Sequence, residues 1–335
     1  MKKIELLAPG KNLENLKIAY KFGADAVYIG EKFYSLRARN TNFSLEEIKE
    51  AKKIALSYKK KIYIALNMIP HNEDVEDIEK LKNYIKELAN IKIDAFIVSD
   101  IYLMSLCKDI APQIELHIST QASVSNIEAS KFFKRYNAKR VILARECSFE
   151  DIKQITSLEN MESEVFIHGG MCMAYSGKCL LSNYMTTRDA NRGGCAHSCR
   201  WYYDLFSSKG KKVAESKITF SSKDLQAADF IYDLIEIGVS SLKIEGRMKS
   251  EHYLAIVVNT YRQIIDSYYS KKEIDMEKMK IFLEKSANRK TSSGFFNTMN
   301  IDKQSFSRDD EIPNQDFLAK VLDYDENTKT ATIEQ

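Results

Sequence analysis

Four of the six cysteines in this 335-residue chain lie within one short segment, residues 168–201. Successive cysteines are separated by six, fifteen and three residues, in the order Cys172, Cys179, Cys195 and Cys199. Thiolates bind zinc, and they also hold iron–sulfur clusters. Zinc sites usually combine two short cysteine pairs, and only Cys195 and Cys199 are spaced in that way. The spacing therefore favours an iron–sulfur cluster and leaves Zn²⁺ as the alternative.

Disulfide and nucleophile roles for these thiols are less favoured. The N-terminal sequence MKKIELLAPG has too few apolar residues for a signal peptide, and no window is apolar for the length of a membrane span. We therefore expect a cytoplasmic protein, in which thiols stay reduced. Cys172 and His168 could form a nucleophile and its base, but three cysteines would then have no role. The sequence also lacks H-E-x-x-H, G-x-S-x-G and Walker A motifs.

Short apolar segments alternate with amphipathic ones along most of the chain, which predicts parallel βα units. The predicted strands are 4–7, 26–29, 61–67, 95–99, 114–119, 140–144, 164–168 and 240–246, with a further short strand at 217–222. The predicted helices are 13–23, 44–58, 75–88, 101–110, 127–136, 148–155, 225–237 and 252–269. Eight such units have the size of a (β/α)₈ TIM barrel, here with the cysteine-rich segment inserted after strand seven. A doubly wound sheet is the main alternative, but no G-x-G-x-x-G follows the first strand.

The last third of the chain changes character. We assign residues 1–272 to the barrel and residues 273–316 to a helical and irregular linker. Residues 317–335 read as a β-hairpin. Because two strands alone rarely form a stable unit, we expect this hairpin to begin a small β-domain that continues outside the chain.

Polar side chains follow the predicted strands where a TIM barrel places its active site. They are Arg37, His117, Gln121, Arg145, Lys243, Glu245 and Arg247. This rim is rich in arginine, whose planar guanidinium suits carboxylates and phosphates, so an anionic substrate is expected. The formal net charge of +3 permits a nucleic-acid partner only where basic residues cluster.

Several blocks of the chain closely resemble peptidase family U32, the collagenase-like family. The most specific are EVFIHGGMCMAYSGKCLLSNY (164–184), RDANRGGCAHSCRW (188–201) and SLKIEGRMKS (241–250). The resemblance implies an oxygen-independent hydroxylase, because family members modify a tRNA wobble uridine with prephenate, an rRNA cytidine, or a quinone precursor. The block TRDANRG is most similar to the tRNA branch. A small C-terminal β-barrel is usual in that branch, in agreement with the hairpin.

The resemblance also implies site residues and partners. A [4Fe–4S] cluster is expected on the four cysteines, and tRNA and prephenate are the expected partners. We predict catalytic roles for His117, Glu245 and Arg145, the first two in proton transfer. Substrate binding is assigned to Arg37, Gln121, Arg188, Lys243 and Arg247. RNA contacts are considered for Lys59–Lys61, Arg192, Arg200 and residues 201–203. A U32-type peptidase and a zinc-stabilised RNA-binding protein remain the alternatives.

Overall fold

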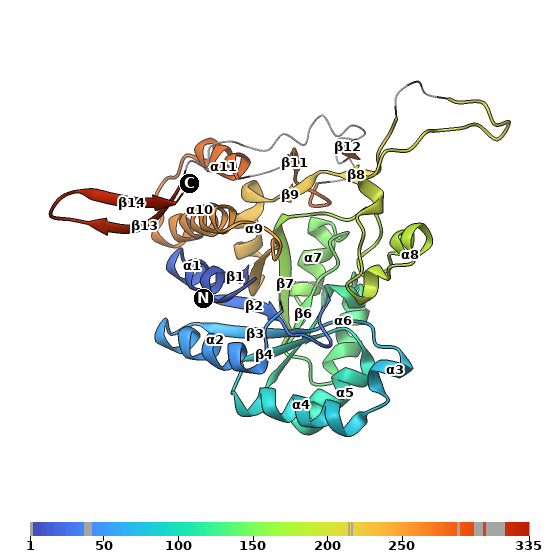
Figure 1. Cartoon of the computed structure of the whole chain (residues 1–335), viewed down its shortest axis with the longest axis horizontal. Coiled ribbons are helices and arrows are strands. Elements are labelled where there is room, and N and C mark those ends of the chain that lie inside the picture. The colour runs from blue at the N-terminus through green and yellow to red at the C-terminus, as the bar shows by residue number, and fades with distance from the viewer. Residues whose placement is uncertain are drawn as a thin grey trace.

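Eight parallel strands close into a barrel in the computed structural model, which describes residues 3–36, 42–213, 215, 217–286, 289–297, 304–305 and 319–334. The closing strand β10 pairs with both β1 and β7 (Figure 1). The strands are β1 (Glu5–Pro9), β2 (Ala26–Gly30), β3 (Lys61–Leu66), β4 (Ala95–Val98), β5 (Glu115–Ile118), β6 (Arg140–Ile142), β7 (Glu162–Gly169) and β10 (Ser241–Ile244). The (β/α)₈ prediction is confirmed.

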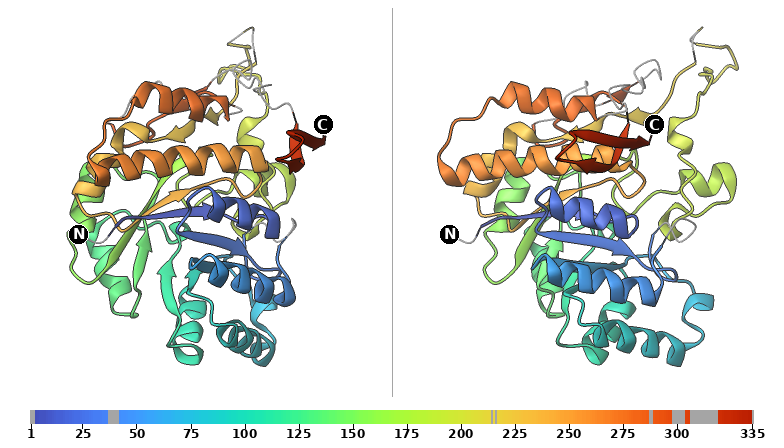
Figure 2. Two further views of the ribbon diagram at one scale, coloured as in Figure 1. Left: turned by 90° about the vertical axis from the view of Figure 1, so that its left-hand side faces the viewer. Right: turned by 60° about the vertical axis from the view of Figure 1, so that its left-hand side comes forward.

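Helices cover the outside of this barrel, one for each strand (Figure 2). They are α1 (Leu13–Lys21), α2 (Leu45–Ser57), α4 (Ile78–Asn90), α5 (Ile101–Ile110), α6 (Ile127–Lys134), α7 (Phe149–Thr156), α9 (Ile231–Glu236) and α10 (Glu251–Ser270). Local sequence fixes many of their starts. Ser44 and Glu47 form a complete capping box at α2, as the sequence predicts. Asp100 and Asn126 cap α5 and α6 through their side-chain oxygens.

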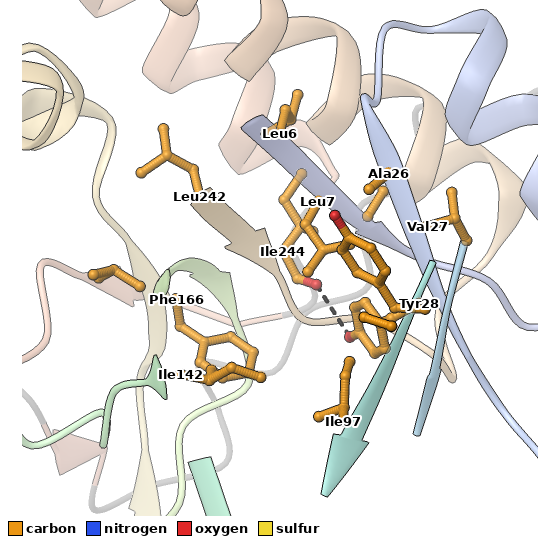
Figure 3. Close-up of a cluster of buried hydrophobic side chains, with 14 of the residues drawn as sticks. Leu6, Leu7, Ala26, Val27, Tyr28, Ile97, Ile142, Phe166, Leu242 and Ile244 are labelled. Carbon is orange, nitrogen blue, oxygen red and sulfur yellow. Dashed lines mark hydrogen bonds between the residues drawn. The ribbon is translucent and has the colours of Figure 1, made fainter. Parts of the chain in front are cut away.

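Apolar side chains from neighbouring strands fill the space between strands and helices. Leu6, Val27 and Leu242 are fully buried there (Figure 3). Because both faces of each strand are covered, the strands are apolar almost throughout rather than alternating. The hydroxyl of Tyr28 donates to the carbonyl oxygen of Ile244 at 3.1 Å, which ties β2 to the closing strand.

The amino-terminal half of the barrel interior holds a buried network of charges. Arg140 is 2% exposed and donates to Glu5 at 2.6 Å, to Glu162 at 2.7 Å and to Glu164 at 2.9 Å. Lys243 donates to the other oxygen of Glu164 at 2.8 Å. Each buried charge therefore has an opposite partner, as burial in a low dielectric requires.

Three predicted elements differ from the structure. The segment 225–237 begins as β9 (Asp224–Gln226), because this stretch pairs antiparallel with the end of β7, and the helix α9 starts only at Ile231. The helix predicted at 75–88 is divided into α3 (Asn72–Val75) and α4, with Asp77 capping the second. The strand predicted at 217–222 is reduced to β8 (Ser221–Ser222).

Beyond the barrel, helix α11 (Met276–Lys285) packs against α10, inside the segment predicted as a linker. Two short strands follow: β11 (Thr291–Ser292) pairs with β9, and β12 (Gln304–Ser305) pairs with β8. The predicted hairpin is present as β13 (Lys320–Asp325) and β14 (Thr330–Glu334). Within the described residues, no helix is long and apolar enough to cross a membrane.

Candidate active site

The cysteine-rich segment leaves the carboxyl end of β7 and includes the short helix α8 (Leu181–Thr186). Figure 1 places α8 beyond the same end of the barrel as α3, which follows β3. The segment therefore lies at the barrel mouth, where TIM-barrel enzymes carry their active sites.

The turn between Cys172 and Cys179 docks on the loops that follow β5 and β6. The Ser176 amide donates to the Glu146 carboxylate at 3.0 Å, and the Ser176 hydroxyl accepts from the Arg145 amide at 3.2 Å. Gly177 has a φ of +73°, and a Cβ there would lie 2.1 Å from the carbonyl oxygen of Gln121. Only glycine combines this backbone conformation with so close an approach.

A second contact holds the segment on α3. The Arg192 guanidinium donates to both carboxylate oxygens of Asp74, at 2.7 and 2.6 Å, and to Glu73 at 3.0 Å. Next to it, the Asn191 side chain donates to the carbonyl oxygen of Cys179 at 3.0 Å. The ion pair with Asp74, made by the single nitrogen Nη2, therefore helps to fix the chain around Cys179.

Three of the clustered thiols lie within electrostatic range of the fourth, Cys199. Burial raises the pKa of the Cys199 thiol, Arg200 opposes this, and Cys172, Cys195 and Cys179 raise the pKa further. The Cys172 thiol keeps contact with solvent, yet desolvation by the surrounding protein raises its pKa, which Arg145 opposes. Because these effects are electrostatic, they place all four sulfurs and two guanidinium groups in one neighbourhood.

Four thiols from one segment are a donor set that suits either zinc or an iron–sulfur cluster. In the described part of the chain, however, no three His, Cys, Asp or Glu side chains already stand in a metal-holding arrangement. A centre held by all four thiols would therefore need another arrangement of the cysteine side chains. The donor set fits such a centre in its chemistry.

Arg145 and Glu245 accompany Cys172 at the mouth. The Arg145 guanidinium lies 4.2 Å from the centre of the Phe166 ring and makes no ion pair with any described residue. Glu245 follows β10, and its charge also raises the pKa of Cys172. The Nε atom of Arg188 is buried and has no hydrogen-bond partner among the described residues. The structure thus brings two predicted site residues, Arg145 and Glu245, to the cysteine segment, which itself contains Arg188.

Two predicted site residues lie inside the barrel instead, so their predicted roles at the mouth are not supported. His117 is fully buried, and its Nε2 atom lies 3.1 Å from a carboxylate oxygen of Glu115 at the start of β5. Burial and the nearby Arg140 charge lower its pKa. Lys243 is engaged with Glu164, and burial lowers its pKa as well.

The remaining predicted residues have structural partners. Arg247 donates to the Ser35 hydroxyl and the Leu36 carbonyl, both at 3.1 Å, and so holds the loop after β2. Gln121 is half-buried against Gly177. Arg37 lies outside the described residues. The run Lys59–Lys61 ends at the first residue of β3, at the opposite end of the barrel from the cysteines.

His168 does not pair with Cys172. Its Nδ1 atom lies 3.2 Å from the Tyr261 hydroxyl, and its ring packs against Tyr253. Burial lowers the pKa of His168 to about 3, so it remains neutral. From the sequence pattern, no role is assigned to Ser176. The dipeptide Ser176-Gly177, between Cys172 and Cys179, is nevertheless typical of a turn.

Comparison with known families agrees with the cysteine motifs. The profile described as "Peptidase family U32" matches residues 11–305. The chain belongs to peptidase family U32. This U32 chain is 44% identical, over its whole length and 81% of the relative's, to "tRNA hydroxylation protein P1" of Bacillus subtilis.

Other U32 relatives carry different names. The chain is 38% identical to "23S rRNA 5-hydroxycytidine C2501 synthase" of Escherichia coli, a match that covers 79% of this chain and 40% of that protein. It is 34% identical to "Collagenase" of Porphyromonas gingivalis, over 79% of this chain and 66% of that protein. Family membership alone therefore does not choose between RNA and peptide substrates.

Proposed function

We propose that this U32 chain hydroxylates a wobble uridine of tRNA without dioxygen, with prephenate as the hydroxyl donor and a [4Fe–4S] cluster on its four clustered cysteines. The observation that carries the RNA substrate is the similarity to the Bacillus subtilis tRNA hydroxylation protein, which extends over the whole of this chain. The similarity to the rRNA-modifying relative covers a smaller share of both proteins. This difference favours tRNA over rRNA.

Positive charge beside the thiols supports a carboxylated donor. Arg145 makes no ion pair in the described part of the chain, and the Nε atom of Arg188 has no partner there. Among the described residues, Arg200 donates only to neutral oxygens, the Ser221 hydroxyl at 3.1 Å and the Met171 carbonyl at 3.3 Å. Guanidinium groups without acidic partners favour an anionic ligand, and prephenate carries two carboxylates.

Replacing a ring C–H by C–OH removes two electrons from the ring. Without dioxygen, transfer of the donor's hydroxyl group balances the step, because the donor's C–O bond breaks and the donor carbon takes up the two electrons and a proton. A bound iron–sulfur cluster supplies one-electron exchange, and Cys172, Cys179, Cys195 and Cys199 would hold it. Glu245, whose charge acts on Cys172, would accept the proton that the ring carbon releases. Arg145 would orient the donor carboxylate over the same thiol.

The test is mass spectrometry of tRNA nucleosides from cells that lack the gene. Hydroxyuridine should disappear and return with the wild-type gene, but not with Cys179→Ser or Arg145→Gln. Cys107→Ala is the matched control, because Cys107 is buried in α5 away from the segment and should restore the nucleoside. Unchanged hydroxyuridine in the deletion strain would refute the tRNA substrate.

The collagenase-named relative makes a peptidase the second candidate. The two functions differ in what the cysteines must do. Protein purified without oxygen should be brown and lose its colour in Cys179→Ser. Colourless protein with stoichiometric zinc would contradict the cluster. Gelatin cleavage that survives the loss of all four cysteines would support a peptidase.

A further inference from the structure

Positive charge is in excess in the segment around the cysteines. Residues 168–222 contain eight lysines and arginines against three acidic residues, a net charge of +5, whereas the whole chain carries +3. The rest of the chain is therefore slightly acidic. Residues 49–61 carry the same net charge, with six lysines against one acidic residue, so the segment 168–222 is one of two that would attract a polyanion, and it is the one that includes the cysteines.

Half of these basic residues lie on a two-stranded arm that follows the last cysteine and is formed by residues 203–213 and 217–220. They are Lys209, Lys211, Lys212 and Lys217. Tyr203 and Ile218 exchange backbone hydrogen bonds of 2.8 and 2.9 Å, and the Val213 amide donates to the Leu205 carbonyl at 2.8 Å. A turn at Gly210 closes the tip. Figures 1 and 2 show the arm extending away from the barrel beyond β8.

The side chains on the arm are not explained by folding. Leu205, Phe206 and Val213 are 43%, 58% and 60% exposed, so they contribute little to a core. Lys209 and Lys211, at the tip, make no ion pair among the described residues. An exposed arm that combines apolar or aromatic side chains with unpaired lysines is typical of a surface that binds single-stranded nucleic acid.

The root of the arm is attached directly to the cysteine site. The carbonyl oxygen of Cys199 accepts from the Phe220 amide at 3.0 Å and from the Thr219 hydroxyl at 3.2 Å. The Tyr203 hydroxyl donates to the Ser198 carbonyl at 2.7 Å. These bonds fix the direction of the arm relative to the thiols, so a strand bound along the arm is guided toward Cys199.

We infer that the arm is an RNA-binding element of this enzyme. The identity of the bound RNA as tRNA rests on the proposed function. Lys209 and Lys211 contact backbone phosphates, and Phe206 offers a ring for base stacking. RNA is favoured over a protein partner because the excess charge of the segment matches a polyanion. The arm delivers the RNA, while the arginines beside the thiols bind the small anionic donor.

The test measures tRNA binding by the full chain as a function of salt. Lys209→Glu with Lys211→Glu should weaken binding on the order of tenfold and lower the slope of log affinity against log salt by about 2. The control changes Lys271 and Lys272 to Glu, which gives the same charge difference on exposed lysines after α10. That control should bind tRNA like the wild type.

Phe206→Ala provides a second readout. It should raise the KM for tRNA in the hydroxylation assay and leave kcat at saturating tRNA unchanged, because Phe206 touches RNA away from the thiols. If the wild type binds tRNA and both arm variants bind it equally well, the inference is overturned and the proposed function stands. If the arm variants bind tRNA normally but change the oligomeric state of the protein, the inference is also overturned, and the arm is a contact between copies of the chain. Absence of tRNA binding by the wild type would overturn both.

Discussion

Gly177→Ala should disrupt the cysteine site more than alanine at any other glycine of the same loop. The new Cβ would lie 2.1 Å from the carbonyl oxygen of Gln121 and 2.8 Å from its carbonyl carbon. Ordinary contact begins at 3.4 Å. Backbone atoms cannot rotate away as a side chain can, so either the segment around Gly177 or the segment around Gln121 must move by about 1 Å. That movement carries the residues between Cys172 and Cys179 away from the β5 and β6 loops.

Gly210→Ala is the matched control. Gly210 has nearly the same backbone conformation, with a φ of +72° against +73° for Gly177, but a Cβ there meets nothing within 4 Å. Both variants should lose about 1 kcal/mol from the positive φ of a non-glycine residue. Only Gly177→Ala should also lose about 1–3 kcal/mol from overpacking.

The assay compares the free energy of unfolding in urea with the reactivity of the thiols toward a coloured disulfide reagent. Gly177→Ala should be less stable than Gly210→Ala, its four clustered thiols should react faster, and its metal content after anaerobic purification should fall. Equal stability and equal thiol reactivity of the two variants would refute the close approach of Gly177 to Gln121.

Three further predictions concern parts of the fold that support the site. Arg192→Lys keeps the charge but loses one of the two nitrogens that donate to Asp74 and Glu73, and should cost about 1 kcal/mol and increase thiol reactivity at Cys179, as thiol titration would show. Burial raises the pKa of Glu31 to about 7, so the folded state binds its proton more tightly than the unfolded chain and loses up to about 3 kcal/mol of stability as pH rises from about 4.5 to 7. Glu31→Gln should remove that part of the pH dependence in urea unfolding at pH 5 and pH 8, and an unchanged slope would contradict it. Arg140→Met should cost about 3–5 kcal/mol in thermal unfolding, because it leaves buried carboxylates without their cation.

The cysteine segment and the barrel could both be predicted from the sequence. Strands that are apolar on both faces, separated by single capped helices, satisfy local rules that do not depend on the rest of the fold. The thiols stood out because four of them share one short segment of a chain expected to keep thiols reduced.

The side-chain layers inside the barrel were decided by the tertiary structure alone. Lys243 lies on β10 and Glu245 directly after its end, and the sequence pattern predicts both at the mouth. In the structure Lys243 reaches Glu164 within the barrel, while the charge of Glu245 acts on Cys172. Strand tilt and register set which layer each inward side chain occupies, and neither can be read from one strand.

The same limit explains the docking of the insertion. Local sequence determined that glycine, serine and cysteine would form turns after β7, but not which loops those turns would meet. The contacts of Ser176 with Glu146, and of Arg192 with Asp74, join residues 30 and 118 positions apart. Such pairs form only after the barrel has brought the ends of β3, β6 and β7 to one face, because closure of the sheet, not chain proximity, places them together.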